Sequence, residues 1–179
     1  MFAIVQNGAV RQVIQPDVEF TVGERKYSSN FIRNSSQQEK LEAGVWEIVY
    51  SARPDDRFYW VGGVEYRVNE VKQVVEGSYP ATPKELEDKT ETAEGAAEPQ
   101  VTRGLKSQYI QAAKQQANSA LSATDWMVMR KAERAVKIPA EVVAERKAVI
   151  AKCAALEEAI AACSTVEELI AAVQSQGAL

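Results

Sequence analysis

Residues 124–139 read Thr-Asp-Trp-Met-Val-Met-Arg-Lys-Ala-Glu-Arg-Ala-Val-Lys-Ile-Pro, and this stretch organises the second half of the chain. Thr124 and Asp125 are residue types that cap a helix N-terminus, because a side-chain oxygen accepts a backbone N–H of the first turn. Pro139 disfavours helical backbone at Ile138 and suits the first turn of a new helix. The stretch therefore predicts a short helix from about residue 125, then a corner, then a long helix.

Helical spacing of apolar residues continues on both sides of this stretch, so residues 104–179 are predicted to form a helical domain. A heptad-like seam follows the corner and comprises Val142, Arg146, Val149, Cys153, Leu156, Ile160 and Cys163. The seam packs either inside the chain's own helical bundle or against a partner helix, including a second copy in a homo-oligomer. We favour the first interpretation, because apolar helix stripes usually face their own core. Ser164 and Glu167 have the spacing of a capping box before the last helix.

Residues 1–80 are instead rich in short β-type runs separated by turn residues. Asn7-Gly8 and Gly62-Gly63 each lie between two such runs, and both pairs predict two-residue hairpins. Ser36 and Glu39 predict a capping box that starts one small helix. This half therefore predicts a mainly antiparallel β domain, and the whole chain predicts an α+β fold.

Residues 81–103 are predicted to connect the two domains. Residues 88–102 are mostly Glu, Thr and Ala, with one each of Asp, Lys, Gly, Pro and Gln and no large apolar residue before Val101. Such a segment buries too little apolar surface to offset the entropy lost on ordering. We therefore predict a flexible acidic linker over residues 88–102.

The composition argues against several classes of function. The formal net charge is −4, whereas sequence-independent binding to nucleic acid needs an excess of Lys and Arg. The absence of histidine removes the usual general base and a common zinc ligand, so no catalytic residue, metal or cofactor is expected. Neither a signal peptide nor a membrane span is indicated, which predicts a protein kept in a cytoplasm or packed into a particle assembled there. Cys153 and Cys163 are interpreted as small buried apolar residues.

Arg53-Pro54-Asp55-Asp56-Arg57-Phe58-Tyr59-Trp60 is the most distinctive run of the N-terminal half. The two carboxylates could serve acid–base chemistry or a metal, but turn chemistry explains Pro-Asp-Asp without a site. On a strand, Phe58 and Trp60 share one face and Tyr59 takes the other, so at least one of these aromatics is expected in the core. A partner-binding surface of Tyr59 with Arg57 or Tyr66 is one interpretation, and a fully packed core or a minor exposed edge is the alternative.

Trp126 and Arg130 are one helical turn apart, and two roles are open for them. They form a recognition pair for a partner, or Trp126 fills the gap that the Ile138-Pro139 break leaves at the corner. We favour the structural role and expect Trp126 to be buried.

Thr124-Asp125-Trp126, Arg130-Lys131-Ala132-Glu133-Arg134, Ile138-Pro139-Ala140-Glu141-Val142 and Arg146 together resemble the C-terminal part of tailed-bacteriophage and prophage tail-fibre assembly proteins, the tail assembly chaperone group. The run from Arg53 to Trp60 resembles a block of the same proteins. The resemblance implies a non-enzymatic protein that assists assembly of the tail fibre and binds a fibre or other tail protein. A structural component of the virion tail, fibre or baseplate is the alternative.

Overall fold

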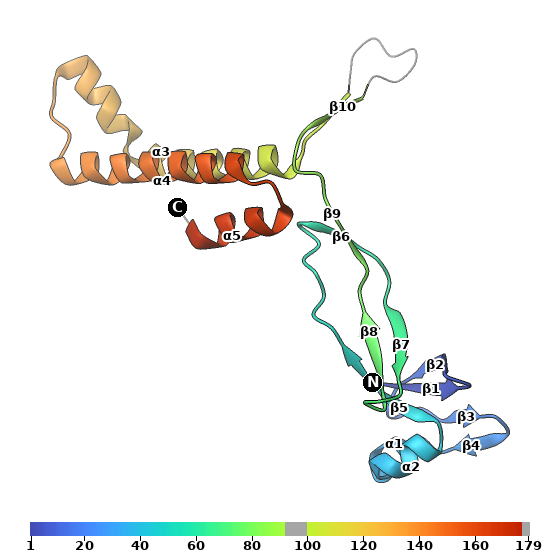
Figure 1. Ribbon diagram of the computed structural model, residues 1–179. Helices are drawn as coiled ribbons and strands as arrows, with labels where there is room; N and C mark the ends of the chain where they lie inside the picture. The colour runs from blue at the N-terminus through green and yellow to red at the C-terminus, as the bar shows by residue number, and fades with distance from the viewer. Residues whose placement is uncertain (92–99, 177–179) are drawn as a thin grey trace. The chain divides into compact units, whose positions relative to one another are not determined.

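The structure is a computed structural model that describes residues 1–91 and 100–176, and Figure 1 shows its elements. The chain divides into two compact units, Met1–Thr82 and Pro83–Leu179. The first unit is mainly β and the second is dominated by three α-helices. The predicted α+β class is confirmed.

A curled five-stranded sheet forms the body of the first unit, in the order β2-β1-β5-β8-β7. Its strands are β1 (Phe2–Gln6), β2 (Ala9–Ile14), β5 (Val45–Tyr50), β7 (Glu65–Asn69) and β8 (Val74–Ser78). Neighbouring strands are antiparallel except β5 and β8, which run parallel. The edge strands β2 and β7 approach each other, so the sheet curls toward closure.

Both faces of this sheet are covered, because alternate residues of β1 enter different apolar clusters. Ala3 packs with Ile48 and Val75 on one face. Ile4 packs on the other face, in a cluster that includes Phe20 and Tyr27. These two rings stack with centroids 5.1 Å apart and come from a separate hairpin of β3 (Phe20–Val22) and β4 (Arg25–Tyr27).

Two short helices follow this hairpin, α1 (Phe31–Asn34) and α2 (Gln37–Glu42). The predicted capping box at the start of α2 is confirmed: the Glu39 N–H donates to Ser36 Oγ, and the Ser36 N–H donates to the Glu39 carboxylate. The same contacts lower the pKa of Glu39, through hydrogen bonds from the backbone and side chain of Ser36.

One of the two predicted glycine hairpins is confirmed and the other is wrong. Asn7 and Gly8 have φ of 52° and 71° and join β1 to β2. Gly62-Gly63 joins no hairpin, because β6 (Tyr59–Val61) pairs with β9 (Ala81–Pro83) while β7 pairs with β8. A Cβ on Gly62 would lie 3.0 Å from Pro80 Cγ, so close backbone approach explains this glycine.

The second unit contains α3 (Leu105–Arg134), α4 (Ala140–Ala162) and α5 (Val166–Gln176). Helix α4 packs against both α3 and α5. Cys153, Leu156, Ile160 and Cys163 of the predicted seam are buried, so this part of the seam belongs to the chain's own core, as favoured. The last capping box is shifted by one residue, since Thr165 Oγ1 accepts the Glu168 N–H and the Glu168 carboxylate accepts the Thr165 N–H.

The predicted helix start at Thr124 and Asp125 is wrong, because α3 runs through both residues without a break. Figure 1 shows instead that α3 bends in this region, so that its last turns point away from α4. Thr124 Oγ1 donates to the Leu121 carbonyl, and such back-bonding by Ser and Thr favours bent helices. The corner itself is confirmed: Ala135 has φ of 55° and caps α3, and Pro139 caps α4.

The predicted linker contains ordered strands at both of its ends. β10 (Lys89–Glu91) pairs antiparallel with β11 (Gln100–Thr102), which a flexible segment over residues 88–102 would not do. Residues 92–99, the middle of that segment, lie outside the described residues. The error has a physical cause: backbone pairing between β10 and β11 needs no large apolar side chain, and composition alone does not reveal it.

Candidate interaction surface

The distinctive stretch of the second unit is held together by Arg146 of α4. Its Nη1 donates to the Leu121 carbonyl at 2.8 Å and to Thr124 Oγ1 at 2.6 Å. Its Nη2 forms an ion pair with Asp125 Oδ1 at 2.9 Å. The Arg146 side chain is only 19% exposed, so these contacts are partly shielded from water. Thr124 and Asp125 therefore orient Arg146 and join α3 to α4, which is a different role from the helix cap expected of them.

Trp126 follows this contact but does not fill the corner, and the expectation that it is buried is wrong. Its side chain is 53% exposed. The Arg130 guanidinium lies over the indole, 4.9 Å from the ring centroid, which is cation–π geometry. About half of the indole surface is therefore open to solvent.

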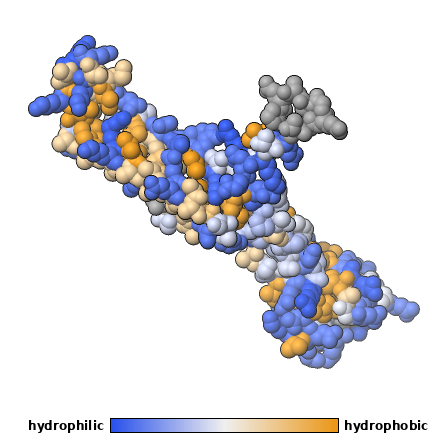
Figure 2. Space-filling model, turned by 45° about the horizontal axis from the view of Figure 1, so that its top comes forward, coloured by the Kyte–Doolittle hydropathy of each residue, from blue (hydrophilic) through white to orange (hydrophobic). Residues whose placement is uncertain are grey.

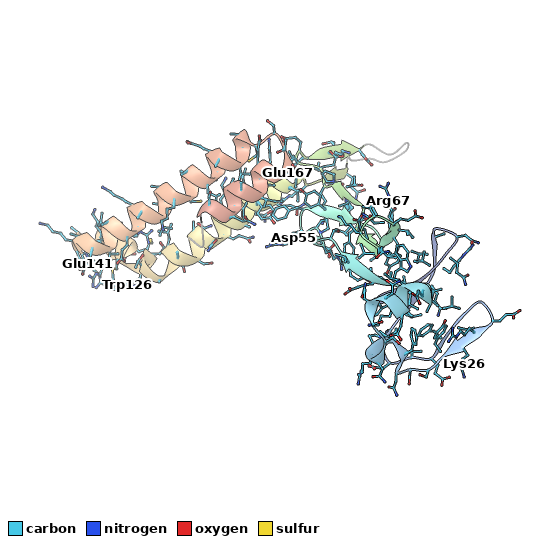
Figure 3. All side chains as sticks on the ribbon, turned by 60° about the horizontal axis from the view of Figure 1, so that its bottom comes forward. Lys26, Asp55, Arg67, Trp126, Glu141 and Glu167 are labelled. Atoms are coloured by element: carbon cyan, nitrogen blue, oxygen red, sulfur yellow. The ribbon has the colours of Figure 1, made fainter. Side chains whose placement is uncertain are left out.

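Four consecutive apolar residues, Trp126-Met127-Val128-Met129, occupy this divergent part of α3. Successive residues are about 100° apart around a helix, so four in a row surround most of its circumference and a single neighbouring helix cannot cover them all. Met129 is 60% exposed, and Val128 and Val136 are also exposed. Figure 2 shows hydrophobic side chains at the surface of this end of the helical unit, and Figure 3 shows Trp126 at the same end as Glu141. We call residues 126–138 the hairpin tip.

The N-terminal candidate residues take separate positions in the first unit. Arg57 holds Asp55 through Nη2 and Nε, at 2.7 Å and 3.0 Å from Oδ2, and its guanidinium lies over the Phe58 ring. Tyr59 is half-buried on β6, whereas Tyr66 stands on β7 in the five-stranded sheet. Tyr66 contacts Tyr50 edge to face, with centroids 6.4 Å apart.

The alternation predicted for Phe58, Tyr59 and Trp60 is not observed. Phe58 is buried and Trp60 is 68% exposed, although both were expected on one face. The reason is that β6 begins at Tyr59, so Phe58 still belongs to the preceding turn, in which its N–H donates to the Asp55 carbonyl. The expectation that at least one of the three aromatics is core is confirmed by Phe58.

Three tyrosines lie close together at the five-stranded sheet. Tyr50 lies between Tyr66 and Tyr79, and its hydroxyl donates to Met1 Sδ at 2.9 Å. Burial, together with the hydrogen bond and charge of Tyr66, raises the pKa of Tyr50 to about 12. A neutral phenol in this position serves packing and hydrogen bonding rather than acid–base chemistry near neutral pH.

The other candidate chemical groups are engaged in local contacts. Asp55 and Asp56 pair with Arg57 and Arg53, at 2.7 Å and 3.0 Å. Cys153 and Cys163 are free thiols, and they are buried as predicted; burial raises the pKa of both. Within the described residues, no group of three or more His, Cys, Asp or Glu side chains could hold a metal ion. Across the same residues, no helix has the length and apolar character needed to cross a membrane.

No family model, curated protein or solved structure matches this chain.

Sequence reasoning identified Trp126 and Arg130 but missed two features of this surface. The role of Arg146 was hidden because its partners lie more than twenty residues earlier on another helix. The charge of the hairpin tip was also overlooked, although the sequence displays it: residues 126–138 carry four basic side chains and one acidic side chain.

Proposed function

We propose that this protein is a non-enzymatic bacteriophage or prophage tail protein that assists assembly of the tail fibre. The observation that carries the proposal is the hairpin tip, in which Trp126 and Met129 are more than half exposed on a bent helix. Exposed Trp and Arg side chains are the types that contribute most to binding energy at protein interfaces. The resemblance of residues 124–146 to tail-fibre assembly proteins supplies the biological class of the partner.

The two resembling blocks have different local roles in this proposal. Arg146 with Thr124 and Asp125 fixes the bent part of α3 to α4 and so presents the hairpin tip. The block from Arg53 to Trp60 forms a turn closed by two Arg–Asp pairs, and it supplies Arg57 and Tyr59 as a second candidate contact. The protein would act in the host cytoplasm while fibres assemble.

Co-expression with candidate fibre proteins from the same genome tests the proposal. We expect the chain to raise the yield of soluble, assembled fibre, and we expect the double variant Trp126→Ser, Met129→Ser to lose much of that effect while remaining folded. Val71→Ser is the matched control, because Val71 is also an exposed apolar side chain but lies in the first unit. Equal fibre yield with and without the chain would refute the proposal.

Analysis of purified phage particles distinguishes the two tail roles. An assembly factor is expected to be absent from mature particles, whereas a structural component of the tail, fibre or baseplate is present at a fixed ratio. Light scattering of the free protein then shows whether the helices also form a homo-oligomer.

A further inference from the structure

The hairpin tip differs in charge from the rest of the chain. Arg130, Lys131, Arg134 and Lys137 give it four positive charges against one negative charge at Glu133, whereas the whole chain has a net charge of −4. Among the described residues, no carboxylate forms an ion pair with any of these four cations. The positive charge of the tip is therefore not neutralised within the described part of the protein.

Arg130 adds a second observation, because one of its nitrogen atoms makes no hydrogen bond within the described residues. Its Nε is buried, yet it has no hydrogen-bond partner within the described residues. A buried donor without an acceptor is unfavourable, and native proteins rarely leave such groups unpaired. The guanidinium lies over the Trp126 ring, so the two side chains belong to one surface.

From these observations we infer that the hairpin tip binds an acidic segment of another protein that also carries apolar side chains. Carboxylates of that segment pair with Arg130, Arg134 and Lys137, and its apolar side chains pack on Trp126 and Met129. Arg is suited to this role, since its guanidinium can bind a carboxylate and stack on an aromatic ring at the same time. The inference rests on the proposed function for the identity of the partner as a tail protein, and it adds the chemistry of the segment that is bound.

An anionic membrane surface is the competing occupant, and the composition of the tip disfavours it. Helices that lie on bilayers have one continuous apolar face opposite a strongly charged face. Here the exposed apolar side chains surround a short bent segment, and Asp125, Glu133 and Glu141 lie in or beside the tip. A compact cluster of this kind resembles the anchor of a protein interface more than a lipid-binding face.

Two labelled synthetic peptides test the inference with the full chain. One carries Glu and Leu at helical spacing, and in the other every Glu is replaced by Lys. We expect fluorescence anisotropy to show binding of the Glu peptide, weakening as salt is raised, and no binding of the Lys peptide. We expect Arg134→Glu with Lys137→Glu to weaken binding of the Glu peptide about tenfold or more and to create binding of the Lys peptide.

The matched control is Arg11→Glu with Lys152→Glu, which makes the same change in net charge at exposed positions away from the tip. We expect this variant to bind the Glu peptide like the unaltered chain. Equal effects of the two double variants, equal binding of both peptides, or no binding of either would overturn the inference. Binding to phosphatidylglycerol vesicles without binding to the Glu peptide would also overturn it and would assign the tip to a lipid surface.

These outcomes are separable from the proposed function. If the Glu peptide binds at the tip but fibre yield in co-expression does not change, the surface chemistry stands and the tail-fibre role fails. If fibre yield depends on the chain but neither peptide binds, the acidic-segment inference fails alone.

Discussion

Replacing Arg146 by Met is the most informative perturbation of the second unit. The change keeps much of the apolar stem but removes three polar contacts with α3, to Leu121, Thr124 and Asp125. Hydrogen bonds from charged groups contribute about 1.5–3 kcal/mol each, and contacts that share one guanidinium are not additive. The ion pair with Asp125 contributes less, because the Asp125 side chain is 58% exposed. We therefore expect a loss of about 2–4 kcal/mol in the free energy of unfolding.

Urea unfolding followed by far-UV circular dichroism measures this loss, and Lys147→Met is its matched control. Lys147 is the next residue of α4, carries the same charge and is exposed, so its removal is expected to change the free energy of unfolding by no more than about 0.5 kcal/mol. A double-mutant cycle with Asp125→Asn should give a coupling energy of at most about 1 kcal/mol. Equal stability of the Arg146→Met and Lys147→Met variants would refute the role assigned to Arg146.

Three further predictions concern other contacts. Gly104→Ala is expected to lower the melting temperature strongly, because a Cβ at this position would overlap backbone atoms of Leu86 and Glu87. An unchanged melting temperature would show that the backbone at residues 86–87 moves aside at little cost. The pKa of Asp88 is lowered, mainly by a hydrogen bond with the Ser107 side chain and then by the hydrogen bond from the Gly104 N–H. The ionised Asp88 therefore stabilises the fold above the unfolded-state pKa of 3.8, and this stabilisation is lost as pH falls through the lower folded-state pKa. Below about pH 4, the free energy of unfolding of the Asp88→Asn variant should therefore fall less steeply with pH than that of the unaltered chain. Equal slopes for the two proteins would contradict this prediction. Trp126→Ala is expected to lower the free energy of unfolding by about 1 kcal/mol or less, well below the ~3–5 kcal/mol typical of a buried aromatic residue. Thermal melting of the variant distinguishes an exposed Trp126 from a buried one.

Local patterns predicted several elements of the fold. The β1–β2 hairpin follows from Asn7-Gly8, and the start of α2 follows from Ser36 and Glu39, because both need only a few neighbouring residues. The buried end of the α4 seam follows from its spacing of apolar residues, which is also a local property. The corner after α3 follows from Pro139, whose effect on backbone geometry is covalent.

Other parts required knowledge of distant partners. Gly62-Gly63 had the composition of a hairpin turn, but β7 pairs with β8 and β6 pairs with β9, and local sequence does not rank these alternatives. Local sequence also did not reveal that β10 and β11 pair, so their residues were predicted to be part of a flexible linker. Thr124 and Asp125 are residue types that favour a helix N-cap, but here both contact Arg146 of the next helix. In each case pairing with a partner that the local composition does not indicate decided the structure.

The hairpin tip shows the same division within one surface. Four apolar residues, Trp126 to Met129, adjoin a basic run, and Arg130 lies one turn from Trp126; both facts can be read from the residue order alone. The exposure of Trp126 cannot be read from the residue order, because burial depends on whether a second element covers that face of the helix. Here Arg146 of α4 holds α3 just before the tip, and α3 bends away beyond it. The residue types are therefore local information, while their exposure depends on the path of α3 beside α4.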